Sequence, residues 1–556
     1  MTGAAAQIGR LWRTVRWLRA EQVWGRLRLH LPRPRPDARP APPRRRTTGR
    51  WVPPAARQAS LMAGARMDFL GQQHDLDRVG WDDPQLPLLW RYNQHYFDDL
   101  NAAGAAQRHD AQRALIVRWL AENPPGRGTA CAPFPTSLRI VNWVKWFLGG
   151  STPEPAWLDS LALQARWLTQ RLEWHLLGNH LFANAKALVF AGLYFEGAEA
   201  EHWLACGLDI LARELPEQLL SDGGHFERSP MYHALALEDL LDLLNLVECL
   251  APAHPRAGPL ASDLRRHSAA MLRWLRLMTH PGGSLARFND CAEGIAPSGA
   301  EIQRYAAALG VSCEAADPAR TTDSGDGITV LQPSGYLRAQ RAEVVALLDL
   351  APIGPDYLPG HAHADTLSFE LSLRGREFIV NRGTSVYGDG ARRLVERGTA
   401  AHSTVQLGGH DSSEVWSGFR VGRRARPGPV QAQGWTVDGS HDGYGHLPGR
   451  PQHHRRWHFE DAALTVDDRI DPAAAEAAVA RFHLAPGLRL EAIDTAGTRW
   501  RVLAGATPCA SVEVLVGAAQ VEPWQHALRF GRLVEASTLA VTLERGAASV
   551  RWCWTT

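Results

Sequence analysis

The sequence has almost no lysine: Lys145 and Lys186 are the only two in 556 residues. Its positive charge is carried by arginine, whose planar guanidinium group suits paired hydrogen bonds to carboxylates and sulfates. The formal net charge of +2 gives no global indication of nucleic-acid binding. No run of about 18 apolar residues occurs, which argues against a transmembrane helix.

The seven cysteines are scattered, odd in number and without a CxxC spacing. Neither a disulfide framework nor a thiolate metal site is therefore expected. The N-terminus also lacks the uninterrupted apolar core of a secretory signal peptide, so such a signal is not evident.

The first thirty residues read instead as a basic amphipathic helix. Leu11, Val15, Leu18 and Val23 alternate with many arginines. Such a helix is able to touch a membrane surface, but packing against the body of the protein is the favoured interpretation. Residues 32–57 follow as a connector rich in proline and arginine, which predicts a semi-extended segment.

Between about residues 95 and 310 the pattern is helical, with apolar residues at positions i, i+3 and i+4. The predicted helices are 113–120, 137–148, 157–172, 180–195, 201–215, 231–250 and 263–278. Many successive helices with short connections indicate helical hairpins stacked in a ring or solenoid.

After about residue 325 the segments become short and alternating, separated by Gly, Pro or Asp, which is typical of antiparallel strands in sandwich-like sheets. The predicted strands lie within 335–340, 342–350, 365–373, 377–383, 462–470, 481–493, 511–517 and 538–546. We therefore predict an α+β multidomain chain. Its parts are the basic helix with its connector (1–60), a helical domain (61–322) and an antiparallel β-sheet domain (323–556).

The segment GHAHADTLSFEL (360–371) carries the strongest indication of a site. Read as a strand with period two, it puts His361, His363 and Asp365 on one face, followed by core hydrocarbon. Buried or half-buried polar groups need partners. The pattern therefore predicts a site at the start of this strand, whereas frayed histidines at a strand end are the less favoured interpretation.

Two segments of the helical half carry polar residues near expected helix starts. In SLRIVNW (137–143), Arg139 and Asn142 share a face, and ligand contact and a solvated helix edge are equally compatible with that pattern. In GNHLFANAKAL (178–188), Gly178 and Asn179 suit a turn and cap, with His180 in the first helical turn. On the pattern alone, Asn179 as a simple N-cap is the preferred interpretation.

The segment DGGHFERSPMYH (222–233) predicts a further helix start. Ser229 has the character of an N-cap and Pro230 of the first helical residue. Tyr232 then lies in the first turn, where the helix dipole and Arg228 would favour a phenolate. A buried amphipathic tyrosine is the alternative.

Imidazoles from neighbouring strands predict a metal site in the sheet half. The expected ligands are His363 and His402 with either Asn381 or Asp365, a set of nitrogen and oxygen donors that suits zinc. Asn381 is the weak member, because a neutral amide oxygen is a poor zinc ligand.

Over roughly residues 90–430 the sequence resembles the heparinase II/III family of polysaccharide lyases. The segments that carry the resemblance are NQHYFDDL (93–100), SLRIVNW, GNHLFANAKAL, DGGHFERSPMYH, GHAHADTLSFEL, VNRGTSVY (380–387) and RGTAAHSTV (397–405). The resemblance implies an incomplete (α/α) toroid followed by antiparallel β-sheets, and cleavage of an acidic polysaccharide or oligosaccharide by β-elimination.

The same resemblance implies roles for particular residues. Asn179 and His180 match the pair that neutralises the substrate carboxylate, Tyr232 matches the catalytic tyrosine, and His361 matches a histidine that assists it. Tyr387 resembles a second tyrosine that some members use as base.

The resemblance also concerns the metal site and the surrounding polar residues. His363 and His402 match two ligands of a structural zinc. Asn381 stands where the family has an aspartate ligand, which puts metal occupancy in question. The further candidates for substrate contact are Arg139, Asn142, His225, Arg228, Arg393 and Arg397.

The residue chemistry agrees with elimination. Hydrogen-bond donors from Asn179, His180 and His361 would stabilise the anion that forms when the proton next to a uronate carboxylate is removed. A tyrosine among arginine and histidine is able to move the protons.

Two other functions stay open. A glycoside hydrolase would need two acids flanking the bond, for which Asp222 and Glu227 are candidates. A non-catalytic polysaccharide-binding protein of a surface-polysaccharide pathway would keep the fold alone. Glycosaminoglycan, alginate-like polymer and bacterial exopolysaccharide all suit an arginine-rich site. The sequence favours an intracellular or export-associated role in a bacterium, leaves a periplasmic location compatible, and does not indicate the oligomeric state.

Overall fold

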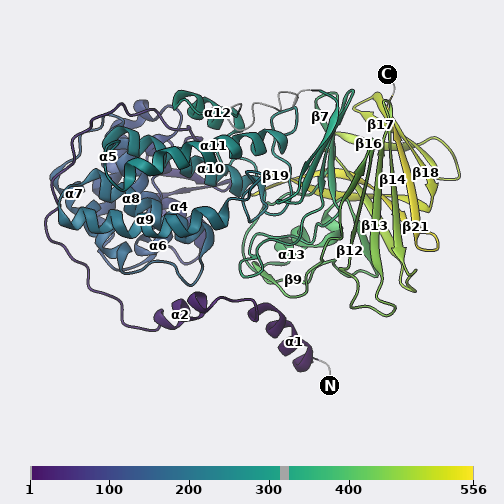
Figure 1. The fold of residues 1–556 in the computed structure, drawn as a ribbon, viewed down its shortest axis with the longest axis horizontal. Helices are drawn as coiled ribbons and strands as arrows, with labels where there is room; N and C mark the ends of the chain where they lie inside the picture. The colour runs from purple at the N-terminus through teal and green to yellow at the C-terminus, as the bar shows by residue number, and fades with distance from the viewer. Residues whose placement is uncertain (1–2, 314–324, 555–556) are drawn as a thin grey trace.

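The structure is a computed structural model that describes residues 3–313 and 325–554. A helical half and a β-sheet half lie side by side, and two N-terminal helices, α1 (Gly3–Val15) and α2 (Ala20–Arg28), lie outside both (Figure 1). Within the described residues, no helix combines the length and the apolar character that crossing a bilayer requires.

The helical half is an incomplete (α/α) toroid, as predicted. Its helices are α3 (Leu76–Val79), α4 (Leu88–Gln94), α5 (His109–Glu122), α6 (Pro133–Leu148), α7 (Pro155–Thr169), α8 (Gly178–Tyr194), α9 (Ala198–Gln218), α10 (Pro230–Leu250), α11 (Ala257–Leu277) and α12 (Gly299–Ala308). Every helix predicted from the apolar spacing is present, with ends that differ by a few residues.

Alternate helices form the inner layer of the toroid. Helix α8 packs against α6 and α10, and nearly all of its residues are buried, which is why its sequence is apolar around the whole circumference. Helices α9 and α11 bury only one face each and keep charged residues on the other.

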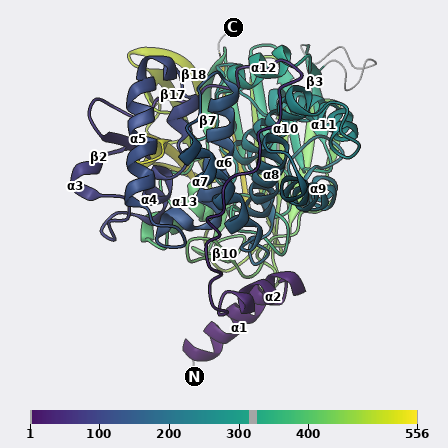
Figure 2. The same ribbon diagram turned by 90° about the vertical axis from the view of Figure 1, so that its left-hand side faces the viewer.

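The connector after α2 runs along the outside of the toroid (Figure 2). It forms no helix or extended strand, but its backbone is held by hydrogen bonds from Arg45 N to Tyr194 O (2.8 Å) and from Gly49 N to Cys249 O (2.8 Å). A short hairpin of β1 (Arg66–Phe69) and β2 (Gln72–Asp75) follows.

The β half consists mainly of two antiparallel sheets. The first has the order β19-β20-β15-β7-β6-β5-β4-β3, with β8 also paired to β15, and the second has the order β11-β12-β13-β14-β21-β18-β17-β16. The strands of the first sheet are β3 (Gly327–Leu331), β4 (Tyr336–Arg341), β5 (Val344–Asp349), β6 (Phe369–Leu373), β7 (Arg376–Val380), β8 (Val405–Leu407), β15 (Ala478–Leu484), β19 (Ala518–Arg529) and β20 (Arg532–Thr542).

The strands of the second sheet are β11 (Gln431–Gln433), β12 (Thr436–His441), β13 (Gln452–Phe459), β14 (Ala463–Asp471), β16 (Leu488–Ala492), β17 (Arg499–Ala504), β18 (Thr507–Val516) and β21 (Ala547–Cys553). Between the sheets and the toroid lie the short helix α13 (Ala391–Arg397) and the small pair β9 (Val415–Trp416) and β10 (Arg420–Val421).

The first sheet is covered on both faces. One face packs on the second sheet through side chains such as Phe369 and Trp552. The other meets the end of the toroid, where Trp274 of α11 packs with Tyr336 and Leu347. Double coverage explains why β5 and β6 are buried at every position rather than at alternate ones.

The period-two interpretation of the His-rich segment is wrong. Strand β6 begins only at Phe369, and residues 360–368 form turns and irregular backbone, with Leu367 at a φ of 64°. Ala362 and Ala364 are as buried as His363, so burial does not alternate along the segment. The alternation of residue types in the sequence therefore does not correspond to the two faces of a strand.

Candidate active site

Tyr232 lies in the first turn of α10, as predicted. The Ser229 hydroxyl accepts a hydrogen bond from Tyr232 N (3.1 Å), and Pro230 is the first helical residue. The same hydroxyl donates to the backbone oxygen of Asp290. The helix start that carries the tyrosine is thus attached to the segment between α11 and α12.

Aromatic groups from both halves of the molecule meet at Tyr232. Its ring lies 3.8 Å, centroid to centroid, from the His361 imidazole, and its hydroxyl lies 3.1 Å from that of Tyr387. Phe419 packs edge-on against both His361 and Tyr387. The toroid tyrosine and the histidine of the β half therefore share one site.

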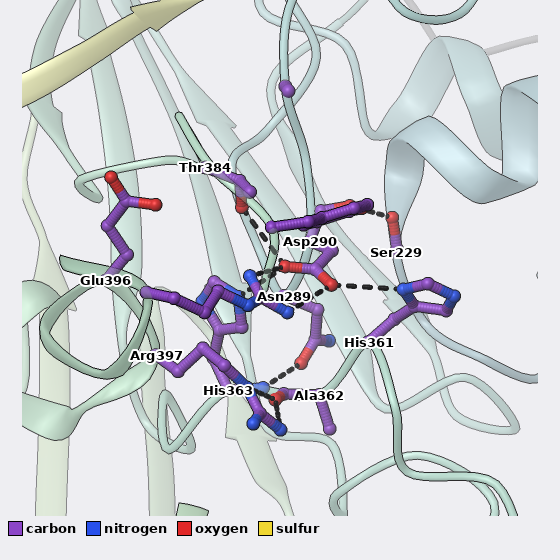
Figure 3. A network of polar contacts seen from close by, with 12 residues as sticks. Ser229, Asn289, Asp290, His361, Ala362, His363, Thr384, Glu396 and Arg397 are labelled. Carbon is purple, nitrogen blue, oxygen red and sulfur yellow. Dashed lines mark hydrogen bonds and ion pairs between the residues drawn. The ribbon is translucent and has the colours of Figure 1, made fainter. Parts of the chain in front are cut away.

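Asp290, which the sequence analysis did not single out, is the centre of the polar network at this site (Figure 3). Its buried carboxylate forms hydrogen bonds with His361 Nδ1 (3.0 Å) and His363 Nε2 (2.9 Å), and it accepts one from Arg393 Nη2 (2.7 Å). Burial alone would raise the pKa of Asp290, but Arg393 and the two imidazoles hold it well below its usual range. A permanent anion thus fixes the ring of His361 through Nδ1.

The segment around Asp290 joins three parts of the chain. Asn289 donates through its side chain to Arg228 O (2.9 Å) and accepts from His363 N (2.9 Å), while its backbone N–H donates to Asp365 (2.8 Å). Asp290 N also donates to His361 O (2.9 Å). The His-rich segment is therefore held in register with the start of α10.

Asn179 and His180 lie in the first turn of α8, but Asn179 is not the helix cap. The helix begins at Gly178, and the cap position is Leu177, with a φ of 65° and no side-chain cap bond. No hydrogen bond from another described residue reaches the half-buried Asn179 side chain. Its amide is therefore free for a ligand.

His180 is paired with a carboxylate through its Nδ1 atom. Its Nδ1 lies 3.2 Å from Glu173, whose carboxylate also accepts from Asn184. Burial alone would lower the pKa of His180, but Glu173 outweighs it and raises the pKa. The protonated imidazolium is therefore more stable here than in a free histidine.

Glu227 links the start of α8 with His361. Its carboxyl group is buried and has no hydrogen-bond partner among the described residues, and His361 Nε2 lies 3.6 Å away. A Cβ at Gly178 would lie 3.4 Å from this carboxyl group and only 2.2 Å from Leu358 of the β half. Gly178 has a φ of 54°, a conformation that favours glycine, and the Leu358 side chain packs close against it, which brings α8 next to the β half.

Burial raises the pKa of Glu227 more than the neighbouring imidazoles lower it. In its protonated form the group is able to donate a hydrogen bond. Burial and the charge of Asp290 likewise raise the pKa of Tyr232, so the predicted resting phenolate is wrong. Arg228, expected to stabilise it, donates instead to Ser334 O and Phe226 O.

Three of the predicted substrate contacts lie in the protein interior. Arg139 is 1% exposed and donates to Gln164, to His95 O and to Ala130 O. The Asn142 amide donates to Tyr96 O and Asp98. His225 is buried, and burial lowers its pKa to about 3. These residues stabilise the interior of the toroid. Arg139 and Asn142 do share a helix face, as predicted, but that face points into the protein and not toward a ligand.

The three other predicted contacts are arginines that donate to backbone oxygens or pair with a buried carboxylate. Arg228 links α10 to Ser334, as above. Arg393 is fully buried on Asp290 and lies 4.8 Å from the Tyr387 ring. Arg397 donates twice to Ala362 O (3.1 and 2.9 Å). The last two therefore position the His-rich segment and Tyr387 rather than facing a ligand.

The predicted metal ligands His363 and His402 come together with a carboxylate. One donor atom from each of His363, His402 and Asp365 lies within 4.8 Å of the others, and all three residues are buried. His363 Nδ1 and both nitrogens of His402 have no hydrogen-bond partner among the described residues. Burial lowers the pKa of both histidines, which leaves neutral imidazoles suited to a metal.

Asn381 is engaged in hydrogen bonds beside this cluster. Its amide oxygen accepts from Ser403 N (3.0 Å) and its amide nitrogen lies 3.4 Å from the Ser368 hydroxyl. The oxygen donor of the cluster is Asp365, the alternative to Asn381 in the sequence. Unpaired buried nitrogens next to a carboxylate fit a zinc ion, whose usual ligands are of these types.

Comparison with known proteins agrees with this arrangement. Residues 146–307 match the model of the heparinase II/III N-terminus, and residues 325–553 match that of the heparinase II/III-like C-terminal region. The chain belongs to the heparinase II/III family. The resemblance noted in the sequence is thereby confirmed.

Two curated relatives differ in their names. The chain is 28% identical over 533 residues to FtsZ-localized protein C of Caulobacter vibrioides, covering 86% of this chain and 84% of the relative. It is 26% identical over 337 residues to a heparin-sulfate lyase of Bacteroides thetaiotaomicron, covering 53% and 47%. Among solved structures, a heparinase III matches with a TM-score of 0.63 at 19% identity, covering 83% of this chain and 76% of the other. That likeness confirms the fold of this heparinase II/III family member.

Proposed function

We propose that this protein is a polysaccharide lyase that cleaves a uronate-containing acidic polysaccharide by β-elimination. The observation that carries the proposal is the meeting of Tyr232, His361 and Tyr387 at one half-buried site. A phenol, a second phenol and an imidazole are the groups that proton abstraction and leaving-group protonation require.

The substrate carboxylate would bind between the two halves. The free Asn179 amide would donate to it, and His180 and Glu227, whose pKa values are both raised, would donate in their protonated forms. His361 lies beside them as a further candidate donor through Nε2. Hydrogen bonds to the carboxylate become stronger as negative charge builds up on it during abstraction of the C5 proton. The site thus lowers the barrier without a hydrolytic water.

Tyr232 is the favoured base. Burial and the charge of Asp290 raise the pKa of Tyr232, and its hydrogen bond with Tyr387 offsets part of that rise. The minor fraction of Tyr232 present as phenolate would take the C5 proton, the C4–O bond would break as the C4–C5 double bond forms, and Tyr387 would give its proton to the departing oxygen. Proton transfer across the 3.1 Å between the hydroxyls would restore the starting state.

The proposal is tested by the product. A panel of heparan sulfate, chondroitin sulfate, alginate and bacterial exopolysaccharides would be incubated with the protein while ultraviolet absorbance is followed. We expect at least one polymer to give absorbing ends, because only elimination creates a conjugated C4–C5 double bond. New reducing ends without absorbance would indicate hydrolysis and contradict the proposal.

A hydrolase is the less favoured alternative. Asp222 accepts from Ser334 N (2.9 Å) and Gly224 N (2.9 Å), so it is not opposed to Glu227 across an open site. Asp290 is the other acid near His361, and it is committed to Arg393. A retaining or inverting mechanism needs two available carboxyl groups flanking the bond.

We further propose that His363, His402 and Asp365 hold a structural zinc ion. The metal would cross-link the His-rich segment to the strand region after α13, and it would satisfy the unpaired nitrogens. We expect about one zinc per chain after dialysis, measured by elemental analysis, and its loss in His402→Ala. The exposed His410→Ala is the control, and a wild-type protein that retains no zinc would contradict the assignment.

A further inference from the structure

The N-terminal helix α1 turns its apolar face away from the protein. Ile8, Leu11, Trp12 and Val15 are spaced as one helical face, and their exposed fractions are 68%, 47%, 63% and 39%. A surface helix of a globular protein normally buries such a stripe. The helix does contact the body, as the sequence favoured, but its apolar residues point outward.

Helix α2 and the residues after it repeat the arrangement. Val23, Trp24 and Leu27 are exposed by 48%, 59% and 55%, and Leu29 and Leu31 by 55% and 63%. Both helices lie on the outside of the molecule, along one side of it (Figures 1 and 2). Large apolar side chains are thus concentrated on one protruding arm, residues 3–31.

The arm is attached to the body through polar contacts. Arg13 forms a paired ion bridge with Glu414, with both distances at 2.9 Å, and the Trp416 indole donates to the Thr14 hydroxyl. These bonds hold the polar face of α1 inward.

Helix α2 is held in the same way. The Gln22 side chain donates to Tyr357 O (3.2 Å), and the arm includes Gly25 at a position where a Cβ would lie 2.6 Å from His175 N. The polar faces of α1 and α2 are thus bonded to the body, and their apolar faces point into the solvent.

The charge of the arm is strongly positive. It carries six arginines, and Glu21 is its only acidic residue. Arg16, Arg26 and Arg28 are exposed beside the apolar side chains. A helix with arginines flanking tryptophan and leucine has the composition of one that lies in the interface of an anionic bilayer.

We propose that the α1–α2 arm docks this protein onto an anionic lipid surface. Trp12 and Trp24, with the exposed leucines, would enter the boundary between headgroups and acyl chains, while the arginines would contact lipid phosphates. A second copy of the chain is the weaker occupant. A symmetric contact between two such arms would bring arginine against arginine.

The proposal is tested with the full-length protein and sedimented vesicles. We expect binding to vesicles of phosphatidylethanolamine with phosphatidylglycerol and much weaker binding to phosphatidylcholine vesicles. Trp12→Asp with Trp24→Asp should weaken partitioning by about tenfold or more. Arg16→Glu with Arg28→Glu should weaken binding by about fivefold per arginine, and only to the anionic vesicles.

Matched controls separate docking from folding. Val117→Asp and Leu515→Asp change side chains that are 52% and 50% exposed elsewhere on the surface, and they should bind like the wild type. All variants should unfold at the wild-type temperature, because none alters a buried residue. Equal binding to both vesicle types, no binding to either, or a dimer that only Trp12→Asp with Trp24→Asp dissociates would overturn the proposal.

Discussion

Replacing Tyr232 by phenylalanine should lower kcat/KM about a thousandfold on any polymer that the wild type cleaves. The change removes the group proposed to take the C5 proton, and a positioned acid or base typically contributes about 10²–10⁴ in rate. The ring and its contact with His361 are retained, so polysaccharide binding should persist. Product absorbance measures the first quantity, and calorimetric titration of the inactive variant measures the second.

Two further substitutions sharpen this test. Tyr387→Phe removes the hydrogen bond that lowers the pKa of Tyr232, so its remaining activity should rise only at higher pH than in the wild type. Tyr444→Phe removes a buried hydroxyl that donates to Val405 O, and it should keep full activity. A Tyr232→Phe enzyme with wild-type kcat/KM would exclude Tyr232 as the base.

Replacing Asp290 by alanine should destabilise the protein by about 3–5 kcal/mol, the usual cost of leaving one member of a buried ion pair alone. Arg393 would be left buried and uncompensated, and His361 and His363 would lose their shared partner. Activity should fall as well, because the imidazole beside Tyr232 would no longer be held. Urea unfolding followed by tryptophan fluorescence measures the stability change.

The partner variants decide whether the buried charge is the cause. Asp290→Ala combined with Arg393→Met should be less destabilised than Asp290→Ala alone, because the orphaned cation is removed. Asp263→Ala, which breaks the exposed pair with Arg266, should change the unfolding free energy by less than about 1 kcal/mol. Equal losses for Asp290→Ala and Asp263→Ala would show that Asp290 is not a structural centre.

Local sequence patterns were sufficient where the chain responds to its immediate surroundings. The apolar spacing predicted the toroid helices, and the short alternating segments predicted the strands. The Ser229 cap and Pro230 start were also correct, because caps depend on the backbone of the next few residues. The period-two pattern failed at residues 360–368, which are turns and irregular backbone instead of a strand.

Burial of polar side chains was much harder to predict. Arg139 and Arg397 look like surface groups in the sequence, yet both are buried and satisfied by backbone oxygens. The reverse holds for Trp12 and Trp24, which are exposed. Whether a side chain faces a neighbour depends on the packing of whole elements, which a single sequence does not report.

The amino-acid sequence by itself thus determined the order of helices and strands, the family resemblance, and the identity of Tyr232, His361 and Tyr387 as residues of interest. Only the tertiary structure brought Tyr232 to Tyr387, which is 155 positions away, and made Asp290 the shared partner of His361 and His363. The physical reason is that repeating patterns record burial along one element. A site made between two halves depends instead on close approach, such as that of Gly178 to Leu358, and on compensation of buried charge.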